Sequence, residues 1–281
     1  MLIDKSKGWK INRIPARQIR MILKRPDGVR IYYETHGNRE DTPVVLLHGL
    51  GADHSMWNLQ IQKYQQMNLF LIVPDVRGHG RSSRVGEFRI EDAARDLAAI
   101  LESMNLKKVS IAGVSMGGLV AQRFAIDFPE KVERLVIVDS FSSNSDWRVR
   151  FNGRLALFLT KLFSKVVLIK IVDSAYGGKR EEMQNIRKYF REQILSQDMD
   201  QLINARRAVN RFDVLDELEN IRLPTLVLVG DHHGKIAIKM AEETAKGIKN
   251  ARFTVLEGGG DPSNMMAPEL FDRNVVEFIK G

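Results

Sequence analysis

A serine between two glycines is the residue of this sequence whose surroundings best suit it to nucleophilic chemistry. Ser115 stands in the pentapeptide Gly113-Val114-Ser115-Met116-Gly117. A β-branched run at 109–112 precedes it, and a helical pattern at 119–125 follows without a gap. Glycines at such a strand–turn–helix junction let the two backbones pass closely, while the serine is held on a strained turn with its hydroxyl projecting. The pattern favours a nucleophilic serine over an ordinary serine in a tight turn.

Eight strands are predicted to position this serine. Apolar runs, continuous or alternating, occur at 19–23, 29–35, 44–47, 69–73, 109–112, 132–138, 225–229 and 252–256. The first two flank a hairpin turn at 26–28, and helical patterns separate most of the others. Strands that alternate with helices in this way predict an α/β fold with a mostly parallel sheet covered on both sides.

The alternation stops between residues 140 and 212. Helical patterns without a strand partner, at 155–172 and 181–195, occupy this stretch. We therefore expect a helical cap at 140–212, a core made of 19–139 and 213–281, and a basic N-terminal extension at 1–18. The apolar residues of 156–171 either line an acyl pocket or pack the cap onto the core, or do both.

Composition limits the class of protein. The 281 residues, of which 44% are hydrophobic, suffice for one α/β domain with an insertion. The absence of cysteine excludes disulfides, a cysteine nucleophile and thiolate metal sites. Three lysines interrupt the most apolar segment, and the first residues do not resemble a signal peptide. These features predict a cytoplasmic protein without stable membrane insertion, and they leave the oligomeric state open.

The net charge is +8, and two basic segments, each with a net charge of +7, are responsible for it. Residues 1–25 hold eight Lys or Arg against one acid, and residues 140–212 hold fourteen against seven. No aromatic interleaving or groove-reading motif accompanies them, so a solvated face is preferred to a nucleic-acid partner. The basic cap also favours anionic substrates, an attraction that added salt would weaken. No cofactor is expected, because no glycine-rich loop follows a strand and opens a helix.

Five landmarks resemble those of the α/β-hydrolase superfamily over residues 19–279. They are HGLG at 48–51, DVRGHGRS at 75–82, GVSMGG at 113–118, LPTLVLVG at 223–230 and SNMMAPELF at 263–271. The sequence is most similar to cap-bearing esterases, enol-lactonases, meta-cleavage-product hydrolases and peroxidase-like relatives. The resemblance implies an α/β-hydrolase fold with an eight-stranded sheet and the cap after the sixth strand.

The same resemblance implies roles for residues around Ser115. The backbone N–H groups of Leu50 and Met116 would form an oxyanion hole, and the dipole of the helix that begins near Met116 would favour the developing negative charge. His48 and His79 would be structural residues of their loops. The reaction implied is hydrolysis of a carboxylic ester, a lactone or a related C–C bond through an acyl-enzyme on Ser115, with a small apolar or anionic ester-like substrate.

The sequence departs from the superfamily in its base and its acid. Relatives follow the order serine, acid, histidine, but no histidine follows His233. Relatives place the acid three residues after the glycine that ends a strand, where this chain has His233 after Gly230. They place the base in a GxGH motif, where this chain has Asp261. The two residue types therefore look exchanged.

Three interpretations of this exchange remain open. In the first, His233 takes the proton of Ser115 and Asp261 orients His233. In the second, the site is impaired, and the chain is either a non-catalytic binding protein that keeps the pocket or a deliberately altered hydrolase. In the third, His232 or His233 pairs with Asp139 or with Asp231, and Asp261 is incidental. A metal site at 231–233 is disfavoured, because adjacent residues rarely converge on one ion.

Overall fold

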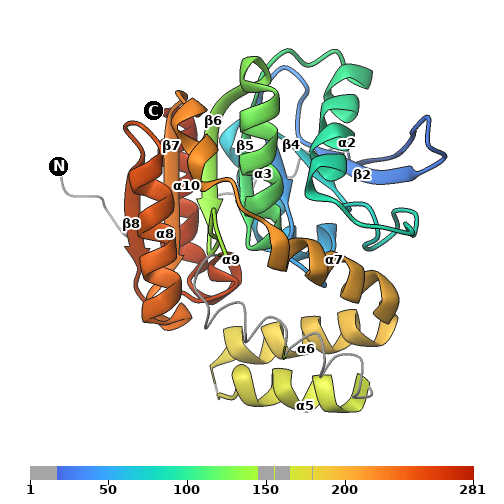
Figure 1. Ribbon diagram of the computed structural model, residues 1–281, viewed down its shortest axis with the longest axis vertical. Helices are drawn as coiled ribbons and strands as arrows, with labels where there is room; N and C mark the ends of the chain where they lie inside the picture. Colours follow the sequence, from blue (N-terminus) through green and yellow to red (C-terminus); the bar gives the residue numbers. More distant parts are fainter. Residues whose placement is uncertain (1–17, 145–154, 156–164, 179) are drawn as a thin grey trace.

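An eight-stranded sheet forms the centre of the molecule (Figure 1). The computed structural model describes residues 18–144, 155, 165–178 and 180–281. The strand order is β1-β2-β4-β3-β5-β6-β7-β8, in which β1 and β2 run antiparallel to their neighbours and the others are parallel. The strands are β1 Ile19–Lys24, β2 Arg30–His36, β3 Thr42–Leu47, β4 Leu69–Pro74, β5 Val109–Val114, β6 Val132–Val138, β7 Thr225–Gly230 and β8 Arg252–Leu256.

Helices cover both faces of this sheet. One apolar cluster joins a face of the sheet to α2 (Ile90–Ser103), α3 (Met116–Asp127) and α8 (Lys235–Gly247). A second cluster joins the other face to α1 (Asn58–Tyr64) and α10 (Pro268–Lys280). Every residue of β4, β5 and β7 is buried, as expected for strands that lie between two helical layers. The carboxyl ends of the parallel strands are thereby held rigidly.

Three helices of the described chain form a cap between β6 and β7. They are α5 (Lys165–Ala175), α6 (Glu181–Ser196) and α7 (Met199–Arg211). Figure 1 shows α7 next to the core, with α6 and α5 successively farther away. Helix α7 buries Ala205 and Val209 in the first apolar cluster, and Met183 and Ile186 of α6 are buried in the second. The cap is therefore packed onto the core at two points.

The eight predicted strands and the mostly parallel sheet with a cap after the sixth strand are confirmed. The basic extension predicted at 1–18 lies outside the described residues except for Gln18. Most of the segment predicted to line an acyl pocket, 156–164, also lies outside them. Among the described helices, none is both long and apolar enough to cross a membrane.

Candidate active site

Ser115 occupies a strained turn between β5 and α3. Its backbone has φ 53° and ψ −116°, a conformation that costs free energy in a residue with a side chain. A Cβ on Gly113 would lie 2.2 Å from the carbonyl oxygen of Gly117, and one on Gly117 would lie 2.3 Å from that of Leu47. No side chain fits in either place. The two glycines of the sequence motif thus have the close-contact role predicted for them.

Two backbone N–H groups beside Ser115 are available to an oxyanion. Met116 is the first residue of α3, so its N–H has no acceptor within the helix. In the described part of the chain, the N–H of Leu50 donates no hydrogen bond. The loop that carries Leu50 is close to the serine, because a Cβ on Gly49 would lie 3.4 Å from the Cβ of Ser115. This arrangement suits the oxyanion hole that the sequence predicts.

Asp261 is the side chain in direct contact with the serine. Ser115 Oγ donates a hydrogen bond to Asp261 Oδ2 at 3.0 Å. Burial raises the pKa of Asp261, and the charge of His233 and the hydrogen bond from Ser115 oppose that rise. A carboxylate whose pKa is raised holds a proton more readily than an exposed one, so Asp261 can accept the proton of Ser115.

His233 lies beside a different carboxylate. Its Nδ1 is 3.8 Å from Asp139 Oδ1, and this buried nitrogen has no hydrogen-bond partner among the described residues. Asp139 follows β6 and accepts hydrogen bonds from the N–H groups of Gly230 (2.9 Å) and Ser263 (2.7 Å) and from the Ser263 hydroxyl (2.9 Å). Burial, and then the charge of Asp261, raise the pKa of Asp139.

The structure thus brings Ser115 and Asp261 into contact, and it places His233 beside Asp139 instead of at the serine hydroxyl. Among the described residues no histidine forms a hydrogen bond with Ser115. The sequence named Asp139 only as an alternative partner of a histidine, and its place at the end of a buried strand was the signal for it. His232 and Asp231 lie in an exposed turn, with 3.9 Å between His232 Nε2 and Asp231 Oδ1.

Two cap residues near Asp261 were missed by the sequence analysis. The hydroxyl of Tyr176, which follows α5, donates a hydrogen bond to the backbone oxygen of Asp261 at 2.7 Å. Arg206, on α7, is close enough to Asp261 for its charge to lower the pKa of that carboxyl. Neither residue belongs to a sequence motif, because a cap helix has no fixed pattern that marks the residues facing the site. The cap therefore interacts with Asp261 through one residue after α5 and one residue of α7.

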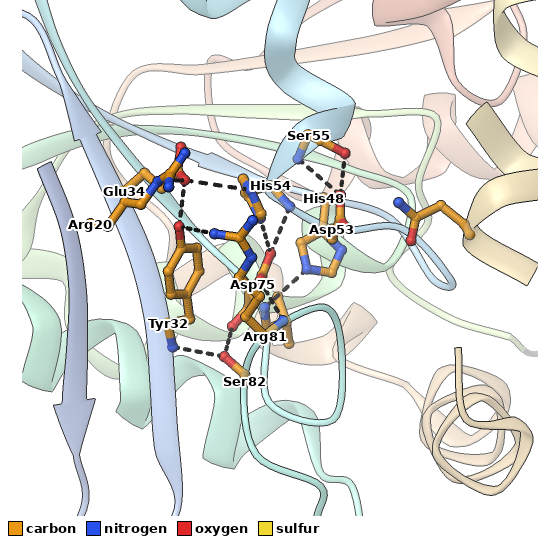
Figure 2. A network of polar contacts seen from close by, with 12 residues as sticks. Arg20, Tyr32, Glu34, His48, Asp53, His54, Ser55, Asp75, Arg81 and Ser82 are labelled. Carbon is orange, nitrogen blue, oxygen red and sulfur yellow. Dashed lines mark hydrogen bonds and ion pairs between the residues drawn. The ribbon is translucent and has the colours of Figure 1, made fainter. Parts of the chain in front are cut away.

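A second polar cluster holds the segment that follows Leu50 in the loop after β3 (Figure 2). His54 Nδ1 and Asp75 Oδ1 are 2.7 Å apart, and His54 Nε2 lies 3.6 Å from Glu34 Oε1 on β2. Burial lowers the pKa of His54, but the hydrogen bond and charge of Asp75, with the charges of Asp53 and Glu34, outweigh it and leave the pKa raised. The His54 N–H also bonds Asp75, so one carboxylate holds both the backbone and the ring.

The two histidines predicted to be structural are buried in the loops of the same region. His48 Nε2 accepts the N–H of Val76 at 2.9 Å, and its Nδ1 lies 2.8 Å from the backbone oxygen of Gly49. His79 packs against His48, with 5.3 Å between the ring centroids. Burial lowers the pKa of His79 to about 3, so this ring is neutral. Both rings connect the oxyanion loop to the loop after β4.

The chain is similar to known proteins of the α/β-hydrolase fold. A family model described as alpha/beta hydrolase fold matches residues 42–171. The chain is 25% identical to 3-oxoadipate enol-lactonase 2 of Acinetobacter baylyi, over 90% of this chain and 94% of the relative. It is 27% identical to a putative carbamate hydrolase, RutD, of Variovorax paradoxus, over 89% and 96%. A solved thermophilic esterase from Thermogutta terrifontis has a TM-score of 0.78 at 26% identity, over 94% of this chain and 98% of that one.

Proposed function

The chain belongs to the α/β-hydrolase superfamily, and from this membership we propose that it hydrolyses a carboxylic ester, a lactone or a related C–C bond through an acyl-enzyme on Ser115. The hydrogen bond of 3.0 Å from Ser115 Oγ to Asp261 Oδ2 is the observation that carries the proposal. Similarity to an enol-lactonase, a putative carbamate hydrolase and an esterase supports a hydrolytic reaction.

The proposed reaction begins when the oxygen of Ser115 attacks the carbonyl carbon of the substrate and its proton passes to Asp261. The N–H groups of Leu50 and Met116 bind the oxyanion of the tetrahedral intermediate. As the intermediate collapses, the leaving group takes the proton from Asp261, and an acyl group remains on Ser115. A water molecule then attacks this acyl group and gives its proton to Asp261, which returns it to Ser115.

The roles predicted from the sequence change places in this proposal. Asp261 is the base, because it is the group in contact with the hydroxyl. His233, which lies beside Asp139 and whose charge lowers the pKa of Asp261, is a positioning residue that keeps the carboxylate ionised when its ring is protonated. This proposal departs from the first interpretation of the exchanged pair, in which His233 is the base and Asp261 orients it.

Hydrolysis of p-nitrophenyl acetate by the wild type and by Ser115→Ala tests the proposal. We expect the variant to lose most of the activity, since the attacking oxygen is absent, and the wild type alone to be labelled at residue 115 by a fluorophosphonate. Ser103→Ala is the matched control, because Ser103 is exposed and bonds only the end of its own helix. Equal rates for wild type and Ser115→Ala would eliminate the serine mechanism and leave the binding-protein interpretation.

A further inference from the structure

Arg206 shares the face of α7 that covers the oxyanion loop. Leu202, one helical turn earlier, lies over this loop, because a Cβ on Gly51 would be 3.3 Å from its Cδ1. Residues four apart on a helix lie on the same side. Gly51 is adjacent to Leu50, one of the two oxyanion donors. Arg206 therefore lies on the side of α7 that faces the oxyanion loop.

Helix α7 holds this arginine in a fixed position. The side chain of Gln201 accepts the N–H of Val85 at 2.9 Å and donates to the backbone oxygen of Val85 at 3.0 Å. Asp198 caps the helix by accepting the N–H of Asp200 at 2.8 Å. Ala205, the neighbour of Arg206, is completely buried in the core. The backbone around Arg206 is thus anchored on the core rather than free at the surface.

Arg206 has no partner of its own. Within the described part of the chain it forms no hydrogen bond and no ion pair, although it is only partly exposed. Burial lowers its pKa, and the charge of Asp261 opposes this. By contrast, the buried Arg77 makes two hydrogen bonds of 2.7 Å to Asp96. A cation removed from water without a paired anion costs free energy, and a bound anion would compensate it.

We propose that Arg206 binds a carboxylate group of the substrate, so that the chain acts on esters or lactones that carry a free carboxylate. This inference rests on the proposed function. A planar guanidinium binds a carboxylate through two parallel hydrogen bonds. The charge of Arg206 acts on Asp261, which accepts the hydrogen bond of Ser115, and the two form no ion pair in the described chain. We therefore place the carboxylate of the substrate at Arg206 and its ester or lactone carbonyl at Ser115.

Binding to the Ser115→Ala protein tests the carboxylate site without turnover. The probes are monomethyl glutarate, which carries one ester and one carboxylate, and dimethyl glutarate, its neutral analogue, measured by titration calorimetry. We expect Arg206→Gln to weaken binding of monomethyl glutarate by about ten- to a hundredfold, since a hydrogen-bonded charge pair is lost, and to leave dimethyl glutarate unchanged. Arg206→Lys keeps the charge and should retain part of the preference.

Arg207→Gln is the matched control, because Arg207 is the exposed neighbour on the same helix and its removal changes the net charge equally. It should leave the binding of both probes unchanged. The carboxylate site is overturned if Ser115→Ala binds the two probes equally, or if Arg206→Gln and Arg207→Gln have the same effect. Thermal unfolding checks the fold, and since Arg206 is unpaired, Arg206→Gln should unfold at or above the temperature of its parent.

The outcomes separate this inference from the proposed reaction. If Ser115→Ala hydrolyses esters as fast as the wild type while monomethyl glutarate still binds through Arg206, the serine mechanism fails and the carboxylate site stands. If Ser115→Ala is inactive but Arg206→Gln binds both probes as its parent does, the mechanism stands and the carboxylate site fails. Each result therefore decides one of the two claims.

Discussion

Asp261, Asp139 and His233 form the polar side of the site, and their hydrogen bonds indicate which of them can act on Ser115. Asp139 is buried and accepts three hydrogen bonds, so it is held in place and is not free to take a proton from the serine. Asp261 accepts only the hydrogen bond of Ser115 among described side-chain donors. The group with free acceptor capacity is therefore the one that touches the nucleophile.

Asp261→Asn removes the proposed base and keeps a hydrogen-bond acceptor for Ser115. The amide oxygen can still accept the hydrogen bond of Ser115, but it cannot hold a proton at neutral pH. We expect kcat for p-nitrophenyl acetate to fall by about 10²- to 10⁴-fold, the usual contribution of general-base catalysis. Asp231→Asn, in the exposed turn, is the control and should retain full activity. An unchanged kcat in Asp261→Asn would remove Asp261 from the mechanism.

His233→Gln distinguishes a positioning histidine from a catalytic base. If Asp261 is the base, kcat/KM rises with pH as Asp261 ionises. Loss of the His233 charge raises the pKa of Asp261, because that charge now lowers it. The acidic limb of the pH profile should therefore move to higher pH, with activity retained above it. His232→Gln, its exposed neighbour, should leave the profile in place. Loss of activity at every pH would instead identify His233 as the base.

At the scale of elements, the loops after β7 and β8 are locked together. A Cβ on Gly230 would lie 2.1 Å from the carbonyl carbon of Gly259, and the N–H of His232 donates to the Gly259 oxygen at 2.9 Å. One loop carries His233 and the other carries Asp261. The closeness of these two backbones thus determines where the exchanged residues lie relative to the serine.

Gly230→Ala should therefore affect stability and catalysis together. Its methyl group meets backbone that has no room to yield, and we expect a loss of about 1–3 kcal/mol in the free energy of unfolding with at least a tenfold lower kcat/KM. Gly86→Ala is the matched control, because a Cβ there meets nothing within 4 Å and its φ is not left-handed. Urea unfolding and ester hydrolysis measure both effects. Equal behaviour of the two variants would contradict the packing argument.

Some of these features can be predicted from the sequence, and others depend on how distant segments pack. Strands such as β5 are short apolar runs bounded by turns, so their places follow from local pattern. Ser115 and Met116 follow from one motif, and Asp261 from its place after the last strand. Asp261 is 146 residues from Ser115 along the chain, and the contact between them depends on how the loops after β7 and β8 pack against each other at Gly230. Arg206 depends on the placement of the cap, which no motif encodes.

At the scale of the molecule, the functional groups all lie along one edge of the sheet. The loops after β3, β5, β6, β7 and β8 supply Leu50, Ser115, Asp139, His233 and Asp261, as is usual for α/β sheets. Cap helix α7 carries Arg206, for which we propose a role in substrate binding. If Arg206 binds the substrate as proposed, the positive charge predicted for the cap contributes one residue to the site.

The cluster around His54 joins the loop after β3, which carries Leu50, to β2 and to the loop after β4 (Figure 2). His54 lies between Asp75, Glu34 and Asp53 and packs on the ring of Tyr32. Since its folded pKa is raised, protonated His54 stabilises the folded protein. This contribution is fully present below the unfolded pKa of about 6.5 and is lost as the pH rises through the folded value. The free energy of unfolding of the protein should therefore depend on pH through the protonation of His54.

His54→Gln isolates that contribution. At pH 6 we expect the variant to lose about 1.5–3 kcal/mol in the free energy of unfolding, the worth of a hydrogen bond between charged groups, here the one to Asp75. The difference in free energy of unfolding between the wild type and the variant should decrease as the pH is raised towards 9, because the wild type then loses the same interaction. Asp139 and Asp261, whose pKa values are also raised, destabilise both proteins alike as they ionise, so the difference between the two unfolding curves reports His54 alone. A difference that is constant between pH 6 and 9 would show that the charge of His54 does not stabilise the fold.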